Sequence, residues 1–298
     1  MFWMILKIGF PILLGWMFYR LQLAIIYPSF VPQGSRKEVW KPSDFELRGN
    51  EIEIKSLDGT KLSAYHILGT RKFIVIWFHG NAGNMGHRLP LVRELQKLIP
   101  AHFFMFDYRG YGKSEGLAHE NGIKMDAEAV YLYCKDRYKD YKIIFAAQSL
   151  GGAAAIHVAA KYKEFDGLIL ENTFTSIPAV VPYVLPKLAF FKSFCVQSWA
   201  SIDIIDQIPN SVPVLFMSSG QDEIIPSFHM KDLYEKLTKN KLGHPEEGVY
   251  DGTKWHANGR TISEKVWFHY FPKGTHNELP MQAKFFASWL DYFEKFFP

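Results

Sequence analysis

Lys142-Ile-Ile-Phe-Ala-Ala-Gln-Ser-Leu-Gly-Gly-Ala-Ala-Ala-Ile-His157 is the stretch that decides the fold of this chain. Its first half, residues 143–147, is an apolar run of the kind that fills a buried parallel strand. Residues 151–160 are rich in small side chains and predict a helix. Between them, Ala147-Gln-Ser-Leu-Gly151 matches the nucleophile-elbow pattern G-x-S-x-G, with alanine in place of the first glycine. We therefore predict a sharp strand-to-helix turn that carries Ser149.

The geometry of such a turn explains the residue types around Ser149. The positions two before and two after the serine must be small so that the strand and the helix can approach, and Ala147 and Gly151 are small. We expect a positive φ at Ser149, which costs about 1–3 kcal/mol, and a helix N-terminus aimed at any anion formed there. An ordinary structural loop is the alternative for the pentapeptide alone, but the flanking strand and helix favour the elbow.

Apolar runs and helical patterns alternate along the chain around this stretch. An antiparallel hairpin, residues 51–55 and 62–68 around Asp58-Gly59, precedes the other elements. The alternation that follows indicates βαβ units, and hence an α/β fold with a mostly parallel sheet and helices on both faces. The predicted strands are 73–78, 103–106, 143–147, 167–170, 214–217 and 266–271, and the predicted helices are 88–98, 120–138, 151–162, 228–238 and 281–296.

Two segments fall outside this alternation. Residues 173–213 are punctuated by Pro178, Pro182, Pro186 and Pro213 and carry many Val and Phe residues between two strands, so we predict a small apolar lid over the strand ends. Residues 240–265 form a polar, glycine-rich stretch that a compact domain does not need, and we predict a surface insertion without an assigned role. We thus divide the chain into residues 1–27, a connector at 28–50 and one catalytic domain at 51–298.

Residues 1–27 are almost wholly apolar and predict a membrane anchor. A spanning helix needs about 20 apolar residues, and one could run from about residue 5 to residue 26 with Lys7 and Arg20 near the two interfaces. A cleaved signal peptide is a rival interpretation, but no small-x-small cleavage site follows the apolar run. A helix lying in the membrane interface is the third. The balance of basic residues leans toward a cytosolic catalytic domain.

Composition argues against several other classes of function. The net charge is only +4 and there is no basic stripe interleaved with aromatic residues, so we expect no nucleic-acid partner. The two cysteines, Cys134 and Cys195, have neither metal-ligand spacing nor a disulfide framework and are interpreted as free thiols. We find no cofactor motif and no metal-ligand cluster in the sequence.

A serine nucleophile needs a base and an orienting carboxylate, and both can be placed by chain order. In this arrangement the order is Ser, acid, His. Asp222 follows an apolar strand in a turn, and His276 follows the last strand, so both should lie at the same edge of the sheet as Ser149. Glu223 and Glu171 are rival acids, since one adjoins Asp222 and the other ends the preceding strand.

The oxyanion formed in acyl transfer needs backbone N–H donors. We assign one to Leu150, directly after the nucleophile, and one to Asn81, in the loop Phe78-His-Gly-Asn-Ala-Gly-Asn84. His79 is interpreted as fixing that loop. Asp107 and Arg109, in a glycine-rich loop after the next strand, are interpreted as structural.

Together these motifs resemble one branch of the α/β-hydrolase superfamily, the small membrane-associated serine hydrolases that include the fungal bud-emergence hydrolase relatives and the animal α/β-hydrolase-domain depalmitoylases. The resemblance covers residues 50–298 apart from 240–265. It implies Ser149 as nucleophile, Asp222 as acid and His276 as base. The motifs that carry it are His79-Gly-Asn-Ala-Gly-Asn, Asp107-Tyr-Arg-Gly-Tyr-Gly, Gln148-Ser-Leu-Gly-Gly, Glu171-Asn-Thr-Phe-Thr-Ser, Gly220-Gln-Asp and Gly274-Thr-His-Asn.

The resemblance also bears on location and substrate. Many members of this branch look like single-pass proteins with a lumenal hydrolase domain, which implies the endoplasmic reticulum and conflicts with the charge argument. The depalmitoylases use an acylated, cysteine-rich amino terminus, whereas this chain has no cysteine before Cys134. We expect a membrane-anchored serine hydrolase that acts on esters or thioesters of apolar acyl groups, acylated proteins included. A depalmitoylase, a peptidase of the same fold and a noncatalytic membrane scaffold are the alternatives.

Overall fold

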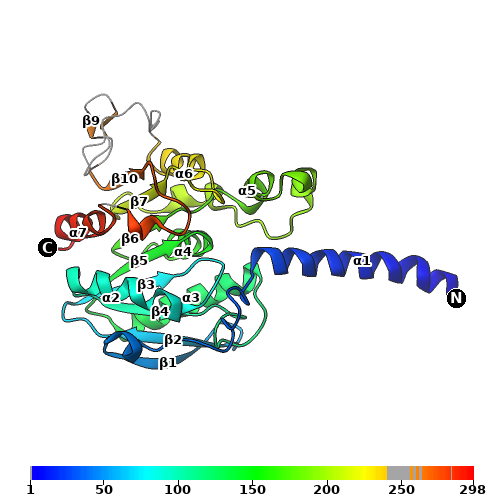
Figure 1. The fold of residues 1–298 in the computed structure, drawn as a ribbon, viewed down its shortest axis with the longest axis horizontal. Helices are drawn as coiled ribbons and strands as arrows, with labels where there is room; N and C mark the ends of the chain where they lie inside the picture. Colours follow the sequence, from blue (N-terminus) through cyan, green and yellow to red (C-terminus); the bar gives the residue numbers. More distant parts are fainter. Residues whose placement is uncertain (1, 240–255, 258–259, 262–263, 283) are drawn as a thin grey trace.

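An eight-stranded sheet forms the centre of the computed structural model, which describes residues 2–239, 256–257, 260–261, 264–282 and 284–298 (Figure 1). The strand order is β1-β2-β4-β3-β5-β6-β7-β10. β1 pairs with β2, and β2 with β4, in antiparallel fashion, and every following pair is parallel. The mostly parallel sheet predicted from the alternation is confirmed. The strands are β1 (Gly49–Lys55), β2 (Lys61–Ile67), β3 (Phe73–Phe78), β4 (His102–Phe106), β5 (Lys142–Gln148), β6 (Gly167–Glu171), β7 (Val214–Ser219) and β10 (Val266–Phe271).

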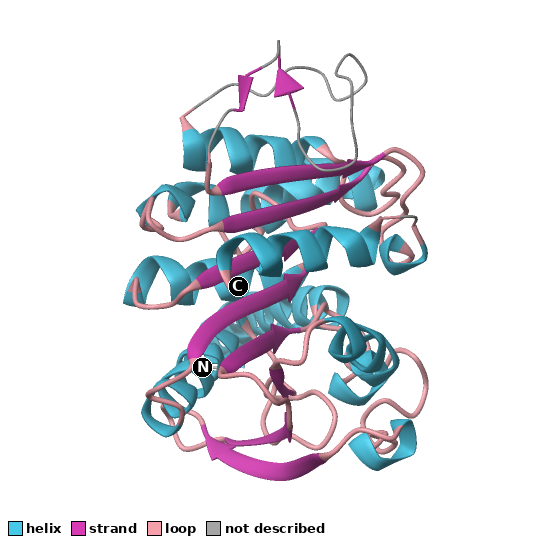
Figure 2. Cartoon of the chain, turned by 90° about the vertical axis from the view of Figure 1, so that its left-hand side faces the viewer, coloured by secondary structure: helices cyan, strands magenta, loops and turns pink. Residues whose placement is uncertain are grey.

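Helices cover both faces of this sheet, as Figure 2 shows. α3 (Glu120–Arg137), α4 (Leu150–Tyr162) and α6 (Phe228–Thr238) contribute to one apolar core, and α2 (Leu89–Leu98) and α7 (Phe285–Phe296) to the other. Successive side chains of a strand point to opposite faces, so in β3 Ile76 lies in the first core and Trp77 in the second. There Trp77 stacks on Trp289 of α7 with ring centroids 5.8 Å apart.

The predicted boundaries agree with the structure to within about two residues except at the last helix. This helix was expected from residue 281, but α7 begins at Phe285. The difference arises because Leu279–Met281 form a separate 3-10 turn, after which the backbone is extended at Gln282 (φ −76°, ψ 139°) and left-handed at Lys284 (φ 73°), and neither conformation continues a helix.

Two elements extend beyond the sheet and its helices. The predicted lid contains α5 (Ile177–Val184) and a long 3-10 segment, η3 (Pro186–Phe194), and helix α1 (Phe2–Ile26) projects away from the sheet on the same side (Figure 1). Within the described residues, none of the helices is both long enough and apolar enough to cross a membrane. Most of the predicted insertion lies outside the described residues, and the parts described are residues 264–265 and the short pair β8 (His256–Ala257) and β9 (Arg260–Thr261).

Candidate active site

The elbow predicted between residues 147 and 151 joins β5 to α4. Ser149 stands at the junction with φ 54° and ψ −120°, a backbone conformation that L-residues rarely adopt. A Cβ on Gly151 would lie 2.0 Å from the carbonyl oxygen of Phe78, so only glycine lets α4 approach β3 this closely. The backbone of Ser149 is fixed on both sides, since its N–H donates to the carbonyl of Glu171 at 2.9 Å and its carbonyl accepts from the Thr173 hydroxyl at 2.7 Å.

A chain of hydrogen bonds leads from Ser149 to Asp222. His276 Nε2 lies 3.1 Å from Ser149 Oγ, and His276 Nδ1 lies 2.7 Å from Asp222 Oδ2. Because a carboxylate only accepts, Nδ1 carries the proton and Nε2 accepts from the serine hydroxyl. Asp222 Oδ1 in turn accepts from the N–H groups of Ile224 and Ile225 at 2.9 and 2.7 Å, which holds the carboxylate in its turn. All three predicted residues therefore meet at one sheet edge.

The two rival acids occupy other positions. Glu223 Oε2 accepts the backbone N–H of His276 at 3.1 Å, so it orients the peptide that carries the imidazole and not the ring itself. Glu171 accepts from the Gln148 side chain at 3.1 Å. Burial raises the pKa of the Glu171 carboxyl to about 7. Its backbone carbonyl, as described above, holds the elbow.

The loop after β3 approaches the nucleophile at the position where an oxyanion hole is expected. A Cβ on Gly80 would lie 3.6 Å from the Cβ of Ser149. Leu150 is the first residue of α4, so its N–H has no acceptor within the helix. The Asn81 side chain donates to the carbonyl of Ile26 at 3.2 Å, which ties this loop to the end of α1.

The interior of the same loop is held by His79 and Asp107. His79 Nδ1 donates to the carbonyl of Gly80 at 2.7 Å, and Asp107 Oδ1 accepts the N–H of Met85 at 2.7 Å. Tyr108 donates its hydroxyl to the carbonyl of His79 at 3.1 Å. Burial lowers the pKa of His79 to about 3 and raises that of Asp107 to about 7. These contacts are of the loop-fixing kind expected from the sequence.

Arg109 ties the hairpin to the helical layer. Its guanidinium binds Asp126 of α3 at 2.8 Å and Asp58 of the β1–β2 turn at 2.7 Å. The side chain of Arg109 is almost fully buried, and the hydrogen bond from Arg109 holds the pKa of Asp58 well below its usual range. This ion-pair network is structural and lies away from the Ser149 hydroxyl.

A cavity of about 530 Å³ lies beside the elbow, between the start of α2 and the turn that precedes α7. Sequence reasoning missed it, because its walls come from five separate segments. It is lined by Gln148, directly before Ser149, and by Glu171, the partner of Gln148 on β6, but not by Ser149 or His276, and most of its surface is apolar. The residues that line it are Trp77, His87, Arg88, Pro90, Leu91, Glu94, Gln148, Glu171, Asn277, Glu278, Pro280, Met281 and Phe286.

Comparison with known proteins shows the family to which the chain belongs. A family model described as serine aminopeptidase, S33, matches residues 69–207. Protein bem46 of Schizosaccharomyces pombe is 36% identical over 282 residues, which cover 92% of this chain and 86% of that protein. The chain belongs to the bem46 type of α/β-hydrolase.

Two further proteins extend the comparison. An uncharacterized membrane protein of Saccharomyces cerevisiae, YNL320W, is 36% identical over 246 residues, or 78% of this chain and 86% of that protein. The esterase Pf2001 of Pyrococcus furiosus superposes with a TM-score of 0.67 at 17% identity, covering 88% of this chain and 98% of the esterase. At that identity the esterase shows that the bem46-type chain has the α/β-hydrolase fold.

Proposed function

We propose that this bem46-type chain is a membrane-associated serine hydrolase that cleaves carboxylic ester or thioester bonds of apolar acyl substrates. The observation that carries the proposal is the hydrogen-bond chain from Ser149 through His276 to Asp222, built on a serine with positive φ. A serine hydroxyl is a weak nucleophile until a base accepts its proton and a carboxylate orients that base.

The reaction follows from these positions. Ser149 Oγ attacks the acyl carbonyl while His276 Nε2 takes its proton, and Asp222 stabilises the imidazolium that forms. The N–H groups of Asn81 and Leu150 stabilise the oxyanion of the tetrahedral intermediate. His276 then returns the proton to the leaving alcohol or thiol as the bond to the acyl carbon breaks. Water, deprotonated by His276, cleaves the acyl-enzyme and restores the serine.

The proposal of an apolar acyl group rests on the surroundings of the elbow. The lid begins at Thr173, whose hydroxyl donates a hydrogen bond to the Ser149 carbonyl. The lid carries exposed Val and Phe side chains. The cavity beside Gln148 adds mostly apolar surface one residue from the nucleophile, although neither Ser149 nor His276 lines it. We expect p-nitrophenyl esters to be cleaved with increasing kcat/KM as the acyl chain lengthens. Equal kcat/KM for all chain lengths would contradict this part of the proposal.

Membrane association rests on two observations. Residues 1–27 are almost wholly apolar, and one relative, YNL320W, is named a membrane protein. We propose that residues 1–27 hold the catalytic domain at a membrane, with the endoplasmic reticulum as the expected compartment. Fractionation of cells that express the full chain, with and without a carbonate wash at high pH, measures how firmly it is held.

Fluorophosphonate labelling of the detergent-solubilised protein tests the nucleophile. The native chain should be labelled, and Ser149→Ala and His276→Ala should abolish labelling while their circular dichroism spectra stay native. Loss of Ser149 or His276 should lower kcat by about 10⁴-fold or more. Labelling that survives in Ser149→Ala would identify a different nucleophile, and a folded native chain that is not labelled would favour the noncatalytic scaffold.

A peptidase is the second candidate, supported by the matching description of a serine aminopeptidase. The same triad can cleave an amide when the histidine, acting as a general acid, protonates the leaving amine. Comparing aminoacyl p-nitroanilides with acyl esters and with thioesters of acylated cysteine peptides separates the peptidase, the esterase and the depalmitoylase.

A further inference from the structure

Helix α1 and the lid are joined through the side chain of Gln22. Its Nε2 donates to the carbonyl of Phe194 at 3.0 Å, and its Oε1 accepts the N–H of Val196 at 2.9 Å. Because this side chain both donates to and accepts from the lid backbone, it fixes the position of α1 relative to the lid. Phe18 of α1 also packs on Phe191 of the lid, with ring centroids 6.1 Å apart.

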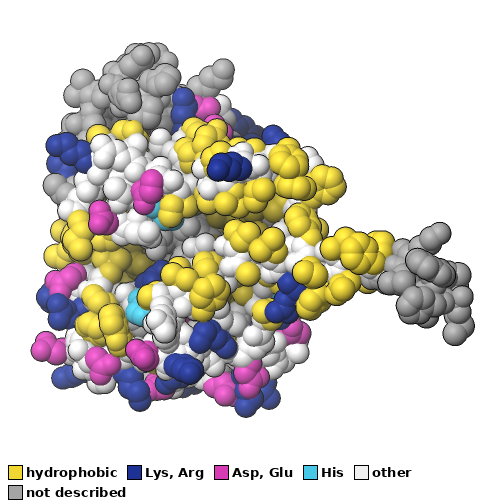
Figure 3. Space-filling view, turned by 45° about the vertical axis from the view of Figure 1, so that its right-hand side comes forward, with side chains coloured by type: hydrophobic (Ala, Val, Ile, Leu, Met, Phe, Trp, Pro, Cys, Tyr) yellow, Lys and Arg dark blue, Asp and Glu magenta, His cyan; other side chains and the backbone are white. Residues whose placement is uncertain are grey.

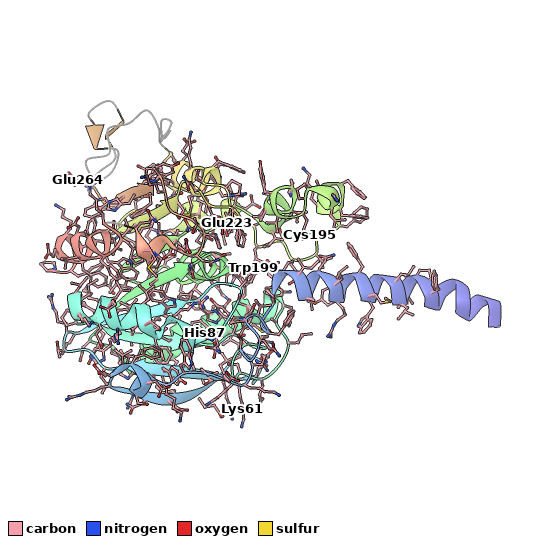
Figure 4. All side chains as sticks on the ribbon, viewed as in Figure 1. Lys61, His87, Cys195, Trp199, Glu223 and Glu264 are labelled. Atoms are coloured by element: carbon pink, nitrogen blue, oxygen red, sulfur yellow. The ribbon has the colours of Figure 1, made fainter. Side chains whose placement is uncertain are left out.

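A buried network continues this junction toward the active site. The Tyr27 hydroxyl donates to Gln197 Oε1 at 2.8 Å and accepts from Trp199 Nε1 at 2.8 Å. Gln197 Oε1 also accepts the N–H of Glu120 at the start of α3, at 2.6 Å. Trp199 lies where α1 meets the rest of the domain (Figure 4). The end of α1 and the lid are therefore one packed unit next to the loop that carries Asn81.

The outer side of this unit is apolar and exposed. We define the apolar surface as the exposed hydrophobic side chains of residues 10–25 and 183–196. In Figure 3 hydrophobic side chains gather on the face from which α1 projects. Phe190, Phe194 and Val196 are 69%, 63% and 59% exposed, values unusual for such residues in water. Its members are Phe10, Ile12, Leu13, Leu14, Trp16, Met17, Phe18, Leu21, Ile25, Tyr183, Val184, Leu188, Phe190, Phe191, Phe194 and Val196.

The charged side chains described within the apolar surface are all basic. Residues 1–37 and 173–200 contain no Asp or Glu. The exposed charged side chains in the α1 and lid parts of the surface are Arg20, Lys187 and Lys192. Apolar and aromatic side chains with Lys and Arg among them are the composition of segments that insert into the headgroup region of anionic bilayers.

We propose that the apolar surface binds an anionic lipid surface, so that the lid as well as α1 enters the headgroup region. The proposal deepens the proposed function and rests on it in one respect: the lid begins at Thr173, whose hydroxyl binds the Ser149 carbonyl, so a lid in the lipid brings acyl chains toward the proposed nucleophile. The lysines contact the anionic headgroups, and Phe190 and Phe194 lie among the acyl chains below them. A protein partner would need carboxylates to match the lysines, and a second copy of this chain would place lysine against lysine.

Co-sedimentation of the full chain with vesicles tests the lid, with vesicles of phosphatidylcholine alone or mixed with phosphatidylserine. Phe190→Ser/Phe194→Ser should lower the partition coefficient about tenfold or more on both vesicles, because two large apolar side chains lose their burial. Lys187→Glu/Lys192→Glu should lower it about tenfold on the mixed vesicles and little on phosphatidylcholine, because only the former carry negative charge.

Matched controls make the same changes away from the apolar surface. Leu57→Ser/Leu98→Ser replaces two exposed apolar residues, and Lys72→Glu/Lys295→Glu reverses two exposed charges at the opposite edge of the sheet. Both controls should bind vesicles as the native chain does. Lid variants that also bind as the native chain does would overturn the proposal, because α1 alone would then contact the lipid.

Two further readouts separate this proposal from its rivals. If light scattering shows a native dimer that the lid variants dissociate while vesicle binding is unchanged, a second copy of the chain covers the surface and the proposal fails. Fluorophosphonate labelling in detergent should be the same in the lid variants and the native chain. If the native chain is not labelled but binds vesicles as expected, the proposal that the apolar surface binds lipid stands, and only the proposed serine hydrolase activity is refuted.

Discussion

Replacing Ser149 by glycine should remove the nucleophile and stabilise the elbow at the same time. The φ of 54° and ψ of −120° at Ser149 place an L-residue in a sparsely populated region, at a cost of about 1–3 kcal/mol. Glycine lacks a Cβ and adopts such angles with little strain. The strain belongs to the backbone, so Ser149→Ala keeps it and Ser149→Gly releases it.

The magnitude follows from two opposing contributions. Released strain stabilises the fold by about 1–3 kcal/mol, and the greater flexibility of unfolded glycine destabilises it by about 0.5–1 kcal/mol relative to alanine. Ser149→Gly should therefore be more stable than Ser149→Ala by about 1 kcal/mol. For a domain of this size that corresponds to a rise in Tm of about 2–4 °C.

Thermal unfolding of both variants in the same detergent measures the difference. Ala153→Gly, on the buried side of the adjoining helix α4, is the matched control, and it should lower the stability by about 1 kcal/mol because its backbone is helical. If Ser149→Gly is less stable than Ser149→Ala by as much as this control, the elbow stores no strain and the reasoning is wrong.

Three other changes test the site. Asp222→Asn should lower kcat about 10⁴-fold with little change in KM, because the imidazole would lose the partner that fixes its tautomer; a kcat within tenfold of native would exclude Asp222 as the acid. Burial raises the pKa of Glu171 from its usual 4.5 to about 7, so the folded chain binds this proton more tightly and loses stability as pH rises from about 4.5 to about 7. Glu171→Gln should remove at most about 3 kcal/mol of that loss, measured by urea unfolding at both ends of the range, and an unchanged pH dependence would show that the carboxyl is not shifted. Gly151→Ala should abolish fluorophosphonate labelling, because the new methyl would lie 2.0 Å from the Phe78 carbonyl oxygen. The control Gly15→Ala should be labelled normally, because its new methyl would have no atom within 4 Å.

The sequence predicted the parts of this structure that depend on local patterns. Buried parallel strands are continuous apolar runs, so β3, β4 and β5 could be located to within about two residues. The positions of Ser149, Asp222 and His276 followed from the rule that the carboxyl ends of parallel strands share one edge. The chain order Ser, acid, His then indicated which acidic residue and which histidine to assign to the triad.

Other features depend on contacts between distant segments and had no local signal. Nothing adjacent to Gln22 in the sequence indicates that it binds the backbone near residues 194 and 196. Glu223 is a rival to Asp222 in the sequence, and contacts with the distant His276 distinguish them, since Asp222 binds the imidazole and Glu223 binds the backbone N–H. The start of the last helix depended on the non-helical backbone of Gln282 and Lys284, two residue types that are ordinary in helices.

The contact between Asn81 and Ile26 has a practical consequence for work on this protein. Removing an apolar amino terminus is a common way to obtain a water-soluble catalytic domain. Here, a chain that began at residue 28 would lose the Ile26 carbonyl that Asn81 binds and the Tyr27 hydroxyl to which the Trp199 indole donates. A water-soluble form should instead keep residues 22–27 and exchange the exposed side chains before them for polar ones.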